Sequence, residues 1–355
     1  MRILIAAPTF GVYGGIEVFA TTLAEWLHQN SPHEVRVCLK LVGDSTVAPP
    51  LQAHCAELPV AVTFVRRGSR GLARAVQWAD LVHSNTCSPD IALLTKAMRK
   101  PLVLTVHNWF RGRHGMRNRL WYLCNRLADW RTYNSQFVRD TWEPQGALPR
   151  GDLIPTVSRL PSAEVRPEER RGFFFIARLI ENKGADILAQ AYLGARIDHA
   201  QWPLTIAGDG PLRSSLEAAL GKQGRAIEFP GFIAETDKVR RMAAARWLVS
   251  PANTREDMGL TPIEARSVGV PAIVSRDGGL PEAGGPTALV CEAGSVDSLR
   301  AALEQAAAMP AEEYRQRASG ARDSLRTYLR PMSDYVAIYR EVSSHRGLTH
   351  SRTLR

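Results

Sequence analysis

The hydrophobic positions of this 355-residue chain gather into short apolar runs that alternate with longer amphipathic stretches. In the first half, the runs that predict buried strands lie at residues 2–8, 34–42, 60–65, 80–84 and 101–108. Helical spacing of apolar residues fills several intervals, most clearly at residues 72–78 and 89–98. Because strands that alternate with helices of this length pair in parallel, the first half is predicted to form a parallel sheet covered by helices.

The second half repeats this pattern. Its predicted strands lie at residues 172–177, 202–208, 227–232 and 246–250, and its predicted helices at 235–245, 299–308 and 312–329. Between the halves, residues 148–170 are rich in proline and charge, which places a linker at roughly 155–170. The pattern predicts two α/β domains, at residues 1–160 and 161–330. A terminal helix at 331–344 and an irregular basic tail at 345–355 are expected to follow.

Residues 128–140, near the end of the first domain, predict a strand followed by a helix with a defined start. An apolar run predicts a strand, Ser135 follows it, and a helix continues to Asp140. Serine is a preferred residue immediately before a helix, because its hydroxyl accepts a hydrogen bond from a free backbone N–H in the first turn. Ser135 is therefore predicted to cap this helix.

The net charge of +10 is concentrated in the first half, where residues 1–165 hold 19 Lys and Arg against 12 Asp and Glu. A basic half suits nucleic acid, an anionic membrane or an anionic substrate, but no nucleic-acid motif accompanies it. The five cysteines are scattered and share no metal-binding spacing with the nine histidines, which fits a reducing compartment. With no apolar run of about 18 residues, and a start too short for a signal peptide, we expect a cytoplasmic protein.

Two carboxylates eight positions apart, Glu256 and Glu264, dominate the candidate chemistry. Glu256 follows the strand predicted at 246–250, and Glu264 lies near the start of a helix that Pro262 helps to begin. This places both acids at the sheet edge where open α/β sheets bind ligands. Two spaced carboxylates suit the hydroxyls of an extended polyhydroxylated ligand, such as a ribose plus a sugar. The alternative is a pair of solvated acids favoured by the helix dipole.

Two cations, Arg178 and Lys183, lie with Gly184 in another strand-to-helix loop of the second half. Such a pair suits a diphosphate, because it neutralises the phosphates and stabilises the charge on a departing nucleotide. In the first half, Gly14 and Gly15 belong to a glycine-rich turn before a helix, where a backbone can approach a phosphate closely. That turn lacks the Gly-x-Gly-x-x-Gly spacing of dinucleotide sites, and a packing role is its alternative.

Four arginines fall within nine residues after the strand at 101–108. Together with two glycines they predict a mobile basic loop before a helix that begins at Leu120. The arginines are Arg111, Arg113, Arg117 and Arg119. The forked guanidinium group suits phosphate, so this loop is a candidate site for an anionic acceptor or for the membrane surface that carries it. The alternative is an ordinary solvated loop.

The stretch Glu256-Asp-Met-Gly-Leu-Thr-Pro-Ile-Glu264, continued by Ala265-Arg-Ser-Val-Gly-Val-Pro271, resembles the nucleotide-sugar signature of retaining glycosyltransferase family 4. The resemblance covers nearly the whole chain, and two further segments that carry it are Arg178-Leu-Ile-Glu-Asn-Lys-Gly184 and Gly208-Asp-Gly-Pro211. Here Asp257-Met258 replaces the usual Gly-Phe, and Arg266-Ser267 replaces a pair of small residues. These departures leave the identity of the sugar open more than the class of enzyme.

The resemblance implies a GT-B fold, in which two Rossmann-like, doubly wound parallel-sheet domains face a central cleft. The first domain would bind the acceptor, the second the nucleotide-sugar, and the terminal helix would cross back to the first. The implied reaction is a retaining, metal-independent transfer of a hexose from a UDP- or GDP-linked donor, with no further cofactor. The implied acceptor is a glycan or lipid-linked saccharide of surface polysaccharide or glycolipid synthesis, at the inner face of the cell membrane.

The resemblance also assigns roles. Glu264 would hold the ribose and Glu256 the hydroxyls of the donor sugar, while Arg178 and Lys183 would stabilise the leaving diphosphate. His107, at the end of the strand at 101–108, would orient the sugar; without the resemblance, a structural role as a strand-end histidine with a hydrogen-bond partner is favoured. Further donor contacts are expected from the residues around these groups, namely Gly14, Gly15, Gly208, Phe232, Met258, Gly259, Leu260, Gly278 and Gly279. No general base is identifiable, which suits a mechanism in which the leaving phosphate takes the acceptor proton.

Three other functions are open to such a chain. A nucleotide-sugar epimerase shares the GT-B fold and would release a free epimer from the donor alone. A nicotinamide dehydrogenase is disfavoured by the missing glycine fingerprint and by the missing ribose-binding acid about 20 residues after it. A non-catalytic nucleotide-binding or membrane scaffold is disfavoured because both glutamates and both phosphate cations are present.

Overall fold

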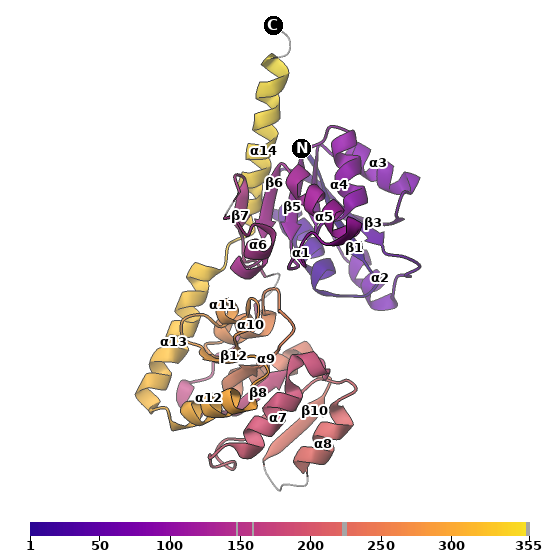
Figure 1. Cartoon of the computed structure of the whole chain (residues 1–355). Coiled ribbons are helices and arrows are strands. Elements are labelled where there is room, and N and C mark those ends of the chain that lie inside the picture. Colours follow the sequence, from indigo (N-terminus) through magenta and orange to yellow (C-terminus); the bar gives the residue numbers. More distant parts are fainter. Residues whose placement is uncertain (147, 158–159, 222–225, 353–355) are drawn as a thin grey trace. The chain divides into compact units, whose positions relative to one another are not determined.

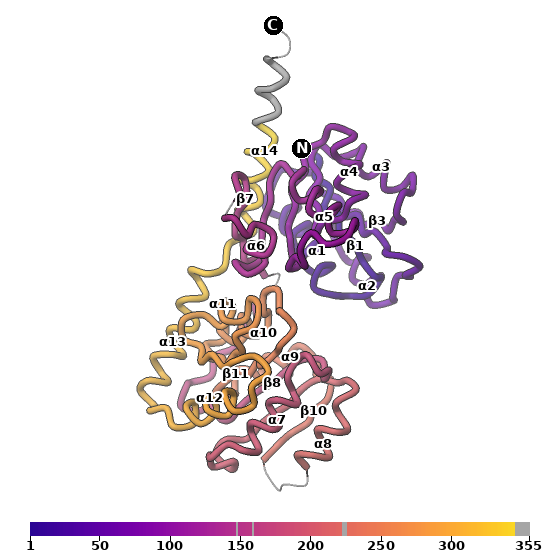
Figure 2. The backbone as a smooth tube through the Cα atoms, in the orientation of Figure 1, coloured from indigo at the N-terminus to yellow at the C-terminus, as the bar shows by residue number. Residues whose placement is uncertain are grey.

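The computed structural model describes residues 1–146, 148–157, 160–221 and 226–352 (Figure 1). The chain forms two compact units, of which unit 1 combines Met1–Ser158 with Arg330–Arg355 and unit 2 is Arg159–Leu329. The two units divide between residues 158 and 159, whereas the second domain was expected to begin at residue 161. The chain therefore passes from one unit to the other twice, as the backbone tube of Figure 2 traces.

Unit 1 contains, among the described residues, a seven-stranded parallel sheet with the order β3-β2-β1-β4-β5-β6-β7. Its strands are β1 (Arg2–Thr9), β2 (Glu34–Leu41), β3 (Ala61–Arg66), β4 (Leu81–Asn85), β5 (Leu102–Val106), β6 (Trp130–Tyr133) and β7 (Gly151–Leu153). The short strand β7 was not predicted, because its proline-rich surroundings indicated a linker. The order reverses between β1 and β4, and this is the position where doubly wound sheets form a ligand crevice.

Helices cover both faces of this sheet because successive side chains of each buried strand point to opposite sides. Ile3, Ile5 and Ala7 of β1 pack with α1 (Gly15–Asn30), α2 (Pro49–Ala56) and α14 (Ser333–Arg352). Leu4 and Ala6 belong to the core on the other face. That face carries α3 (Arg70–Trp78), α4 (Pro89–Ala97), α5 (Gly115–Leu127) and α6 (Gln136–Trp142). Ser135 caps α6 as predicted, with its Oγ accepting from the Val138 N–H at 3.1 Å.

The terminal helix α14 is held on unit 1 by a buried polar chain as well as by apolar packing. The Tyr339 hydroxyl lies 2.6 Å from His83 Nδ1, and His83 Nε2 lies 2.6 Å from Thr105 Oγ1. Burial lowers the pKa of His83 to about 3, so the ring stays neutral at ordinary pH. The predicted end of this helix at residue 344 was wrong, since α14 continues through 345–352, a stretch without the proline that would stop it. Residues 353–355 of the predicted tail lie outside the described residues.

Unit 2 repeats the arrangement with the strand order β10-β9-β8-β11-β12-β13, again parallel throughout the described residues. Its strands are β8 (Arg171–Ile176), β9 (Leu204–Ala207), β10 (Ile227–Gly231), β11 (Ala245–Ser250), β12 (Ala272–Ser275) and β13 (Leu289–Cys291). The helical turn η1 (Pro167–Glu169) precedes β8, and a second, η2 (Glu181–Lys183), follows it. Here the order reverses between β8 and β11.

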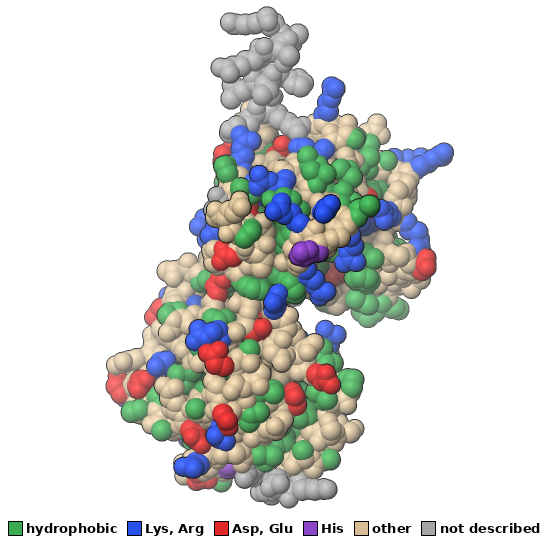
Figure 3. All heavy atoms as spheres, viewed as in Figure 1, with side chains coloured by type: hydrophobic (Ala, Val, Ile, Leu, Met, Phe, Trp, Pro, Cys, Tyr) green, Lys and Arg blue, Asp and Glu red, His purple; other side chains and the backbone are tan. Residues whose placement is uncertain are grey.

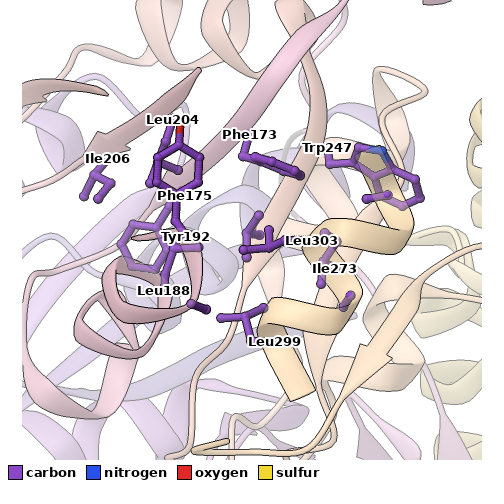
Figure 4. Packing of buried hydrophobic residues seen from close by; sticks show 14 of the residues in the cluster. Phe173, Phe175, Leu188, Tyr192, Leu204, Ile206, Trp247, Ile273, Leu299 and Leu303 are labelled. Atoms are coloured by element: carbon purple, nitrogen blue, oxygen red, sulfur yellow. The ribbon is translucent and has the colours of Figure 1, made fainter. Parts of the chain in front are cut away.

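Two cores lie on the two faces of the second sheet. Phe173 and Phe175 point to one face and pack against Tyr192, Leu299 and Leu303, as Figure 4 shows. The helices on that face are α7 (Ala185–Gly194), α8 (Arg213–Gly221), α12 (Val296–Ala308) and the first part of α13 (Ala311–Tyr328). The other face carries α9 (Glu235–Ala244), α10 (Leu260–Ser267) and α11 (Leu280–Gly284). Because β8 and β11 are parallel, helix α7 after β8 and helix α10 after β11 begin at the same edge of the sheet.

The pairing of Tyr339 with His83 generates a prediction about stability. Tyr339→Phe removes the hydroxyl and leaves His83 Nδ1 buried without this partner, which should cost about 1–3 kcal/mol of unfolding free energy. Urea denaturation of the full chain, followed by a spectroscopic signal, measures that difference. Tyr13→Phe is the control, because the Tyr13 side chain is half-exposed and its change should leave the unfolding midpoint in place. Equal midpoints for the two variants would contradict a stabilising role for the pair.

Candidate functional site

The strongest candidate site lies where the strand order of unit 2 reverses. A cavity of about 60 Å³ opens at the carboxyl ends of β8 and β11. Its lining includes Ala177 after β8, Ser250 at the end of β11, and Gly259 and Thr261 at the start of α10. Lys183 and Glu256, two of the residues predicted from sequence, line the same cavity. The reversal thus brings a cation and a carboxylate from distant parts of the sequence to one place.

Lys183 and Glu256 form an ion pair between Nζ and Oε1, and Thr254 Oγ1 donates to the same oxygen at 3.2 Å. The two loops that carry them are packed backbone to backbone. Gly184 has φ +75°, and a Cβ on this residue would lie 2.3 Å from the Pro251 carbonyl oxygen. The Asn253 N–H also donates to the Asn182 carbonyl at 3.1 Å. Only glycine permits so close an approach, and the approach places Lys183 against Glu256.

The segment 277–279 holds the backbone of Glu256 from the other side. The Asp277 carboxylate accepts from the N–H groups of Arg255 and Glu256, at 3.0 and 3.1 Å. A Cβ on Gly278 would lie 2.2 Å from the Glu256 carbonyl oxygen, so this position also requires glycine. The Gly279 N–H donates to that same oxygen at 2.7 Å. Gly279 was expected among the donor contacts; its N–H is engaged by this carbonyl, and the hydrogen bond orients the Glu256 loop.

Helix α10 begins at Leu260 after Gly259 and carries the second glutamate, Glu264. The side chain of Glu264 pairs with Lys238 of α9 at 2.9 Å, and Lys238 also pairs with Glu235 at 2.8 Å. Burial raises the pKa of Glu264, and the Lys238 ammonium opposes that shift. Sequence analysis missed Lys238, whose position in an ordinary amphipathic helix gives no local signal.

The far end of α10 is held by two buried arginines. Arg170 Nη1 and Nη2 donate to the carbonyls of Gly269 and Val268, just beyond the helix C-terminus, where a cation is favoured by the helix dipole. Arg266 Nη1 donates to the Ala283 carbonyl of α11 at 2.8 Å, and its Nε donates to the Ala321 carbonyl of α13 at 3.3 Å. Arg266 stands where the family pattern has a small residue. Its side chain is directed at α11 and α13, so this departure from the pattern affects helix packing.

The other donor contacts expected in unit 2 differ in their surroundings. Arg178 is exposed two residues after the end of β8, and Phe232 is 88 % exposed directly after β10. Met258 is buried, whereas Leu260 is half-exposed at the first turn of α10. The Gly208 N–H donates to the Gly231 carbonyl at 2.8 Å, so this residue joins the ends of β9 and β10. Its amide is engaged within the chain.

Within unit 1, His107 lies directly after β5, at the carboxyl edge of the sheet. Its Nε2 lies 3.2 Å from Asn85 Oδ1 at the end of β4, and its ring packs edge-on against Phe19 at 4.9 Å. Burial lowers the pKa of His107 to about 4, so the ring is neutral at pH 7. Gly14 caps the start of α1 and Gly15 is its first residue, at the same edge.

The four arginines near α5 were predicted to lie in a mobile loop, but two of them are helical and three stack on aromatic rings. Helix α5 begins at Gly115, so Arg117 and Arg119 are helical, which follows from the lack of any breaker after Gly115. Three guanidinium groups lie over aromatic rings: Arg111 over Trp109, Arg113 over Tyr122 and Arg117 over Trp121, at 5.2, 5.0 and 4.6 Å from the ring centroids. Figure 3 shows Lys and Arg side chains gathered over this part of unit 1. Stacking fixes the planes of the guanidinium groups while their edges stay available.

Two absences apply to the described part of the chain. In residues 1–146, 148–157, 160–221 and 226–352, no group of three or more His, Cys, Asp and Glu side chains is arranged to hold a metal ion. No helix in these ranges combines the length and the apolar character needed to cross a bilayer.

Comparison with known proteins gives matches in both units. The profile of the family described as Glycosyltransferase Family 4 matches residues 13–156, and that of Glycosyl transferases group 1 matches residues 158–323. A GDP-mannose-dependent alpha-(1-6)-phosphatidylinositol monomannoside mannosyltransferase from Mycolicibacterium smegmatis is 29% identical over 206 residues, which are 52% of this chain and 54% of that protein. A GDP-mannose-dependent monoacylated alpha-(1-6)-phosphatidylinositol monomannoside mannosyltransferase from Corynebacterium glutamicum is 36% identical over 133 residues, 35% and 34% of the two chains. The chain thus aligns with about a third to a half of the length of these relatives.

Solved structures share the fold over nearly the whole chain. Anabaena HepE, in complex with UDP and glucose, superposes with a TM-score of 0.73 at 19% identity, covering 98% of this chain and 99% of that one. The lipopolysaccharide outer core galactosyltransferase WaaB superposes with a TM-score of 0.71 at 15% identity, covering 96% and 99%. At these identities the likeness concerns the fold, and it confirms the predicted fold class.

The contact of Gly278 with the Glu256 backbone generates a prediction. Gly278→Ala must displace the Glu256 loop, because the new Cβ would otherwise lie 2.2 Å from a carbonyl oxygen. The unfolding free energy, measured by urea denaturation, should fall by about 1–3 kcal/mol, because the displaced loop loses the hydrogen bond between the Gly279 N–H and the Glu256 carbonyl. Gly221→Ala is the control, because a Cβ there meets nothing within 4 Å. An unchanged unfolding free energy in Gly278→Ala would contradict the assigned role of the 277–279 segment.

Proposed function

Since this chain belongs to glycosyltransferase family 4 through matches in both of its units, we propose that it transfers a hexose from a nucleotide-sugar to an acceptor with retention of configuration. The observation that carries this proposal is the meeting of Lys183, Glu256 and the first turn of α10 at one cavity of unit 2. Each group suits one part of a nucleotide-sugar. An ammonium and a helix N-terminus suit phosphate, and a carboxylate suits hydroxyls.

In the proposed complex, the diphosphate lies against the first amides of α10 and is neutralised by Lys183 and Arg178. Glu256 accepts hydrogen bonds from the donor sugar, and Glu264 accepts them from the ribose. Both cations stabilise the negative charge that grows on the leaving diphosphate, which is the main electrostatic demand of the reaction. Because side chains supply this positive charge, the proposed reaction uses no metal.

The chemical step follows from these contacts. The bond between the anomeric carbon and the phosphate oxygen breaks, and a bond from the acceptor hydroxyl oxygen forms on the same face of the sugar. The acceptor proton moves to the departing phosphate, which becomes the product nucleoside diphosphate. The His107 ring is neutral at pH 7 because burial lowers its pKa, so we propose that it acts through hydrogen bonds and not as an acid.

Both kinds of donor base have support among similar proteins. The mannosyltransferases from Mycolicibacterium smegmatis and Corynebacterium glutamicum are named for GDP-mannose, and HepE was crystallised with UDP and glucose. We therefore propose a GDP- or UDP-linked hexose and give GDP-mannose priority, because these two mannosyltransferases are 36% and 29% identical to this chain, against 19% for HepE.

For the acceptor we propose a phosphate-bearing glycan or glycolipid that docks on the arginines around α5. Three stacked guanidinium groups present ordered donors, and the mannosyltransferase relatives are named for phosphatidylinositol mannosides. Such an acceptor would place the protein at the cytoplasmic face of a membrane as a peripheral protein. This role belongs to unit 1, and the donor role belongs to unit 2.

Calorimetric titration of the parent chain with GDP and UDP tests the donor half of the proposal. One of the two should bind, and Glu264→Ala should weaken it by about tenfold or more, because the ribose hydroxyls lose a charged acceptor. Glu235→Ala is the matched control: it also removes an acid partner of Lys238, but it leaves the ribose carboxylate in place. Hexose transfer is then assayed with the matching nucleotide-sugar. Binding of neither nucleotide, or release of a free epimer without acceptor, would contradict the proposal.

The acceptor half is tested by changing Arg111, Arg113, Arg117 and Arg119 together to alanine. The KM for a phosphate-bearing acceptor should rise about tenfold or more, because several charge-assisted hydrogen bonds are lost, while the nucleotide affinity stays as in the parent. The control changes four other exposed arginines of unit 1, Arg66, Arg67, Arg70 and Arg74, and so removes the same charge. Equal effects of the two quadruple variants would show that net charge, and not this site, matters.

A further inference from the structure

We propose that the ion pair between Lys183 and Glu256 makes the donor-sugar subsite conditional on a diphosphate. Without ligand, the ammonium and the carboxylate neutralise each other. When a diphosphate takes the ammonium, the carboxylate is released and turns to the sugar hydroxyls. This inference rests on the proposed function. It explains how the same site would distinguish a nucleoside diphosphate sugar from a ligand that carries a single phosphate.

The pair is imposed by the fold. Lys183 and Glu256 lie on loops locked together by the contact of Gly184 with Pro251 and by the hydrogen bond from Asn253 to Asn182. Both side chains are mostly buried, with 25 % and 23 % of their surfaces exposed. In such surroundings each charge needs a partner, because an unpaired and partly desolvated charge is costly. Either group can therefore change partner only when a ligand supplies a replacement.

The carboxylate can exchange its partner without disturbing the loop. Lys183 and Thr254 both contact Oε1 of Glu256, so these contacts engage the side chain alone. The Glu256 backbone is held by separate hydrogen bonds. The Glu256 N–H donates to the Asp277 carboxylate, and the Glu256 carbonyl accepts from the Gly279 N–H. Rotation of the Glu256 side chain is then sufficient to release it. Such rotation is fast and needs no rearrangement of the fold.

The pair lies in the cavity itself, since Lys183 and Glu256 are both among its lining residues. A sugar that uses the Glu256 carboxylate must therefore replace Lys183 as the partner of that carboxylate, which ties occupation of this subsite to the arrival of the diphosphate.

The ion pair between Lys238 and Glu264 differs from the pair between Lys183 and Glu256, because Lys238 has a second carboxylate partner. When Glu264 turns to the ribose, Lys238 keeps Glu235 as a counter-charge, since it contacts both acids. Lys183 pairs only with Glu256 among the described residues. A diphosphate must therefore provide the replacement at Lys183. The exchange ends with every charge paired, Lys183 with phosphate and Glu256 with hydroxyls.

Calorimetric titration of Glu256→Gln distinguishes this exchange from a purely attractive site. The nucleoside diphosphate that binds the parent, GDP or UDP, should bind the variant about 3- to 10-fold more tightly, because it no longer competes with a carboxylate for Lys183. The corresponding monophosphate should show no comparable gain. Sugar transfer should be lost at the same time, since the variant lacks the charged acceptor for sugar hydroxyls. A variant that binds its product better and yet transfers nothing is the signature of the exchange.

Three further variants control this measurement. Glu181→Gln removes the same charge two residues from Lys183, at an exposed carboxylate without an ion pair among the described residues, and should leave affinity unchanged. Lys183→Met should weaken diphosphate binding, and Lys183→Met combined with Glu256→Gln should show no gain over Lys183→Met alone. These variants keep the test decisive if one protein is poorly folded.

The outcomes separate the two proposals. Equal or weaker diphosphate binding by folded Glu256→Gln, or a gain of the same size in the double variant, overturns the exchange and leaves the proposed function standing. A parent chain that binds neither GDP nor UDP overturns the proposed function, and the exchange with it.

Discussion

The approach of two backbone segments at the strand-order reversal of unit 2 is the constraint on which the candidate site depends. The loop after β8 touches the loop after β11 through a glycine that has no side chain to separate them, and the 277–279 segment closes on the same loop from the other side. A cation and a carboxylate are thereby placed in contact before any ligand arrives. Because the two loops are fixed in advance, little backbone ordering remains when a ligand enters, and the ligand has only to separate the two side chains.

Helix α10 links this constraint to the body of unit 2. Its first turn reaches the cavity, its middle presents Glu264 to α9, and its end is held by the guanidinium groups of Arg170 and Arg266. Both arginines donate to backbone carbonyls, and Arg266 also donates to the Ser324 hydroxyl, so these buried charges are stabilised by neutral dipoles. The position of the site helix therefore depends on residues that never touch the cavity.

Much of this could be predicted from the sequence, because the deciding signals are local. Apolar runs located most strands, Ser135 marked the start of α6, and the strand-to-helix loops that carry Lys183 and Glu256 were located before their contact was known. The partner of Glu264 could not be found in this way, because Lys238 is defined by the packing of α9 on α10. The stacking of arginines around α5 could not be predicted, since rings that lie two, nine and four residues away in the chain give no periodic signal. Gly279 was expected to contact the donor because a sequence does not show which backbone N–H groups already donate to other parts of the chain.

Unit 1 is assembled from both ends of the chain, with α14 supplied only after all of unit 2 has been made. On a ribosome that adds about 5–20 residues per second, the first sheet waits on the order of ten seconds for its last helix. During that interval the face that will receive Tyr335 and Tyr339 is uncovered, and His83 lacks its phenol partner. Unit 2 is continuous and can close on its own as it emerges. The part of the protein that is synthesised first is therefore the part that finishes folding last, and its open face is where a nascent chain is most exposed to misassociation.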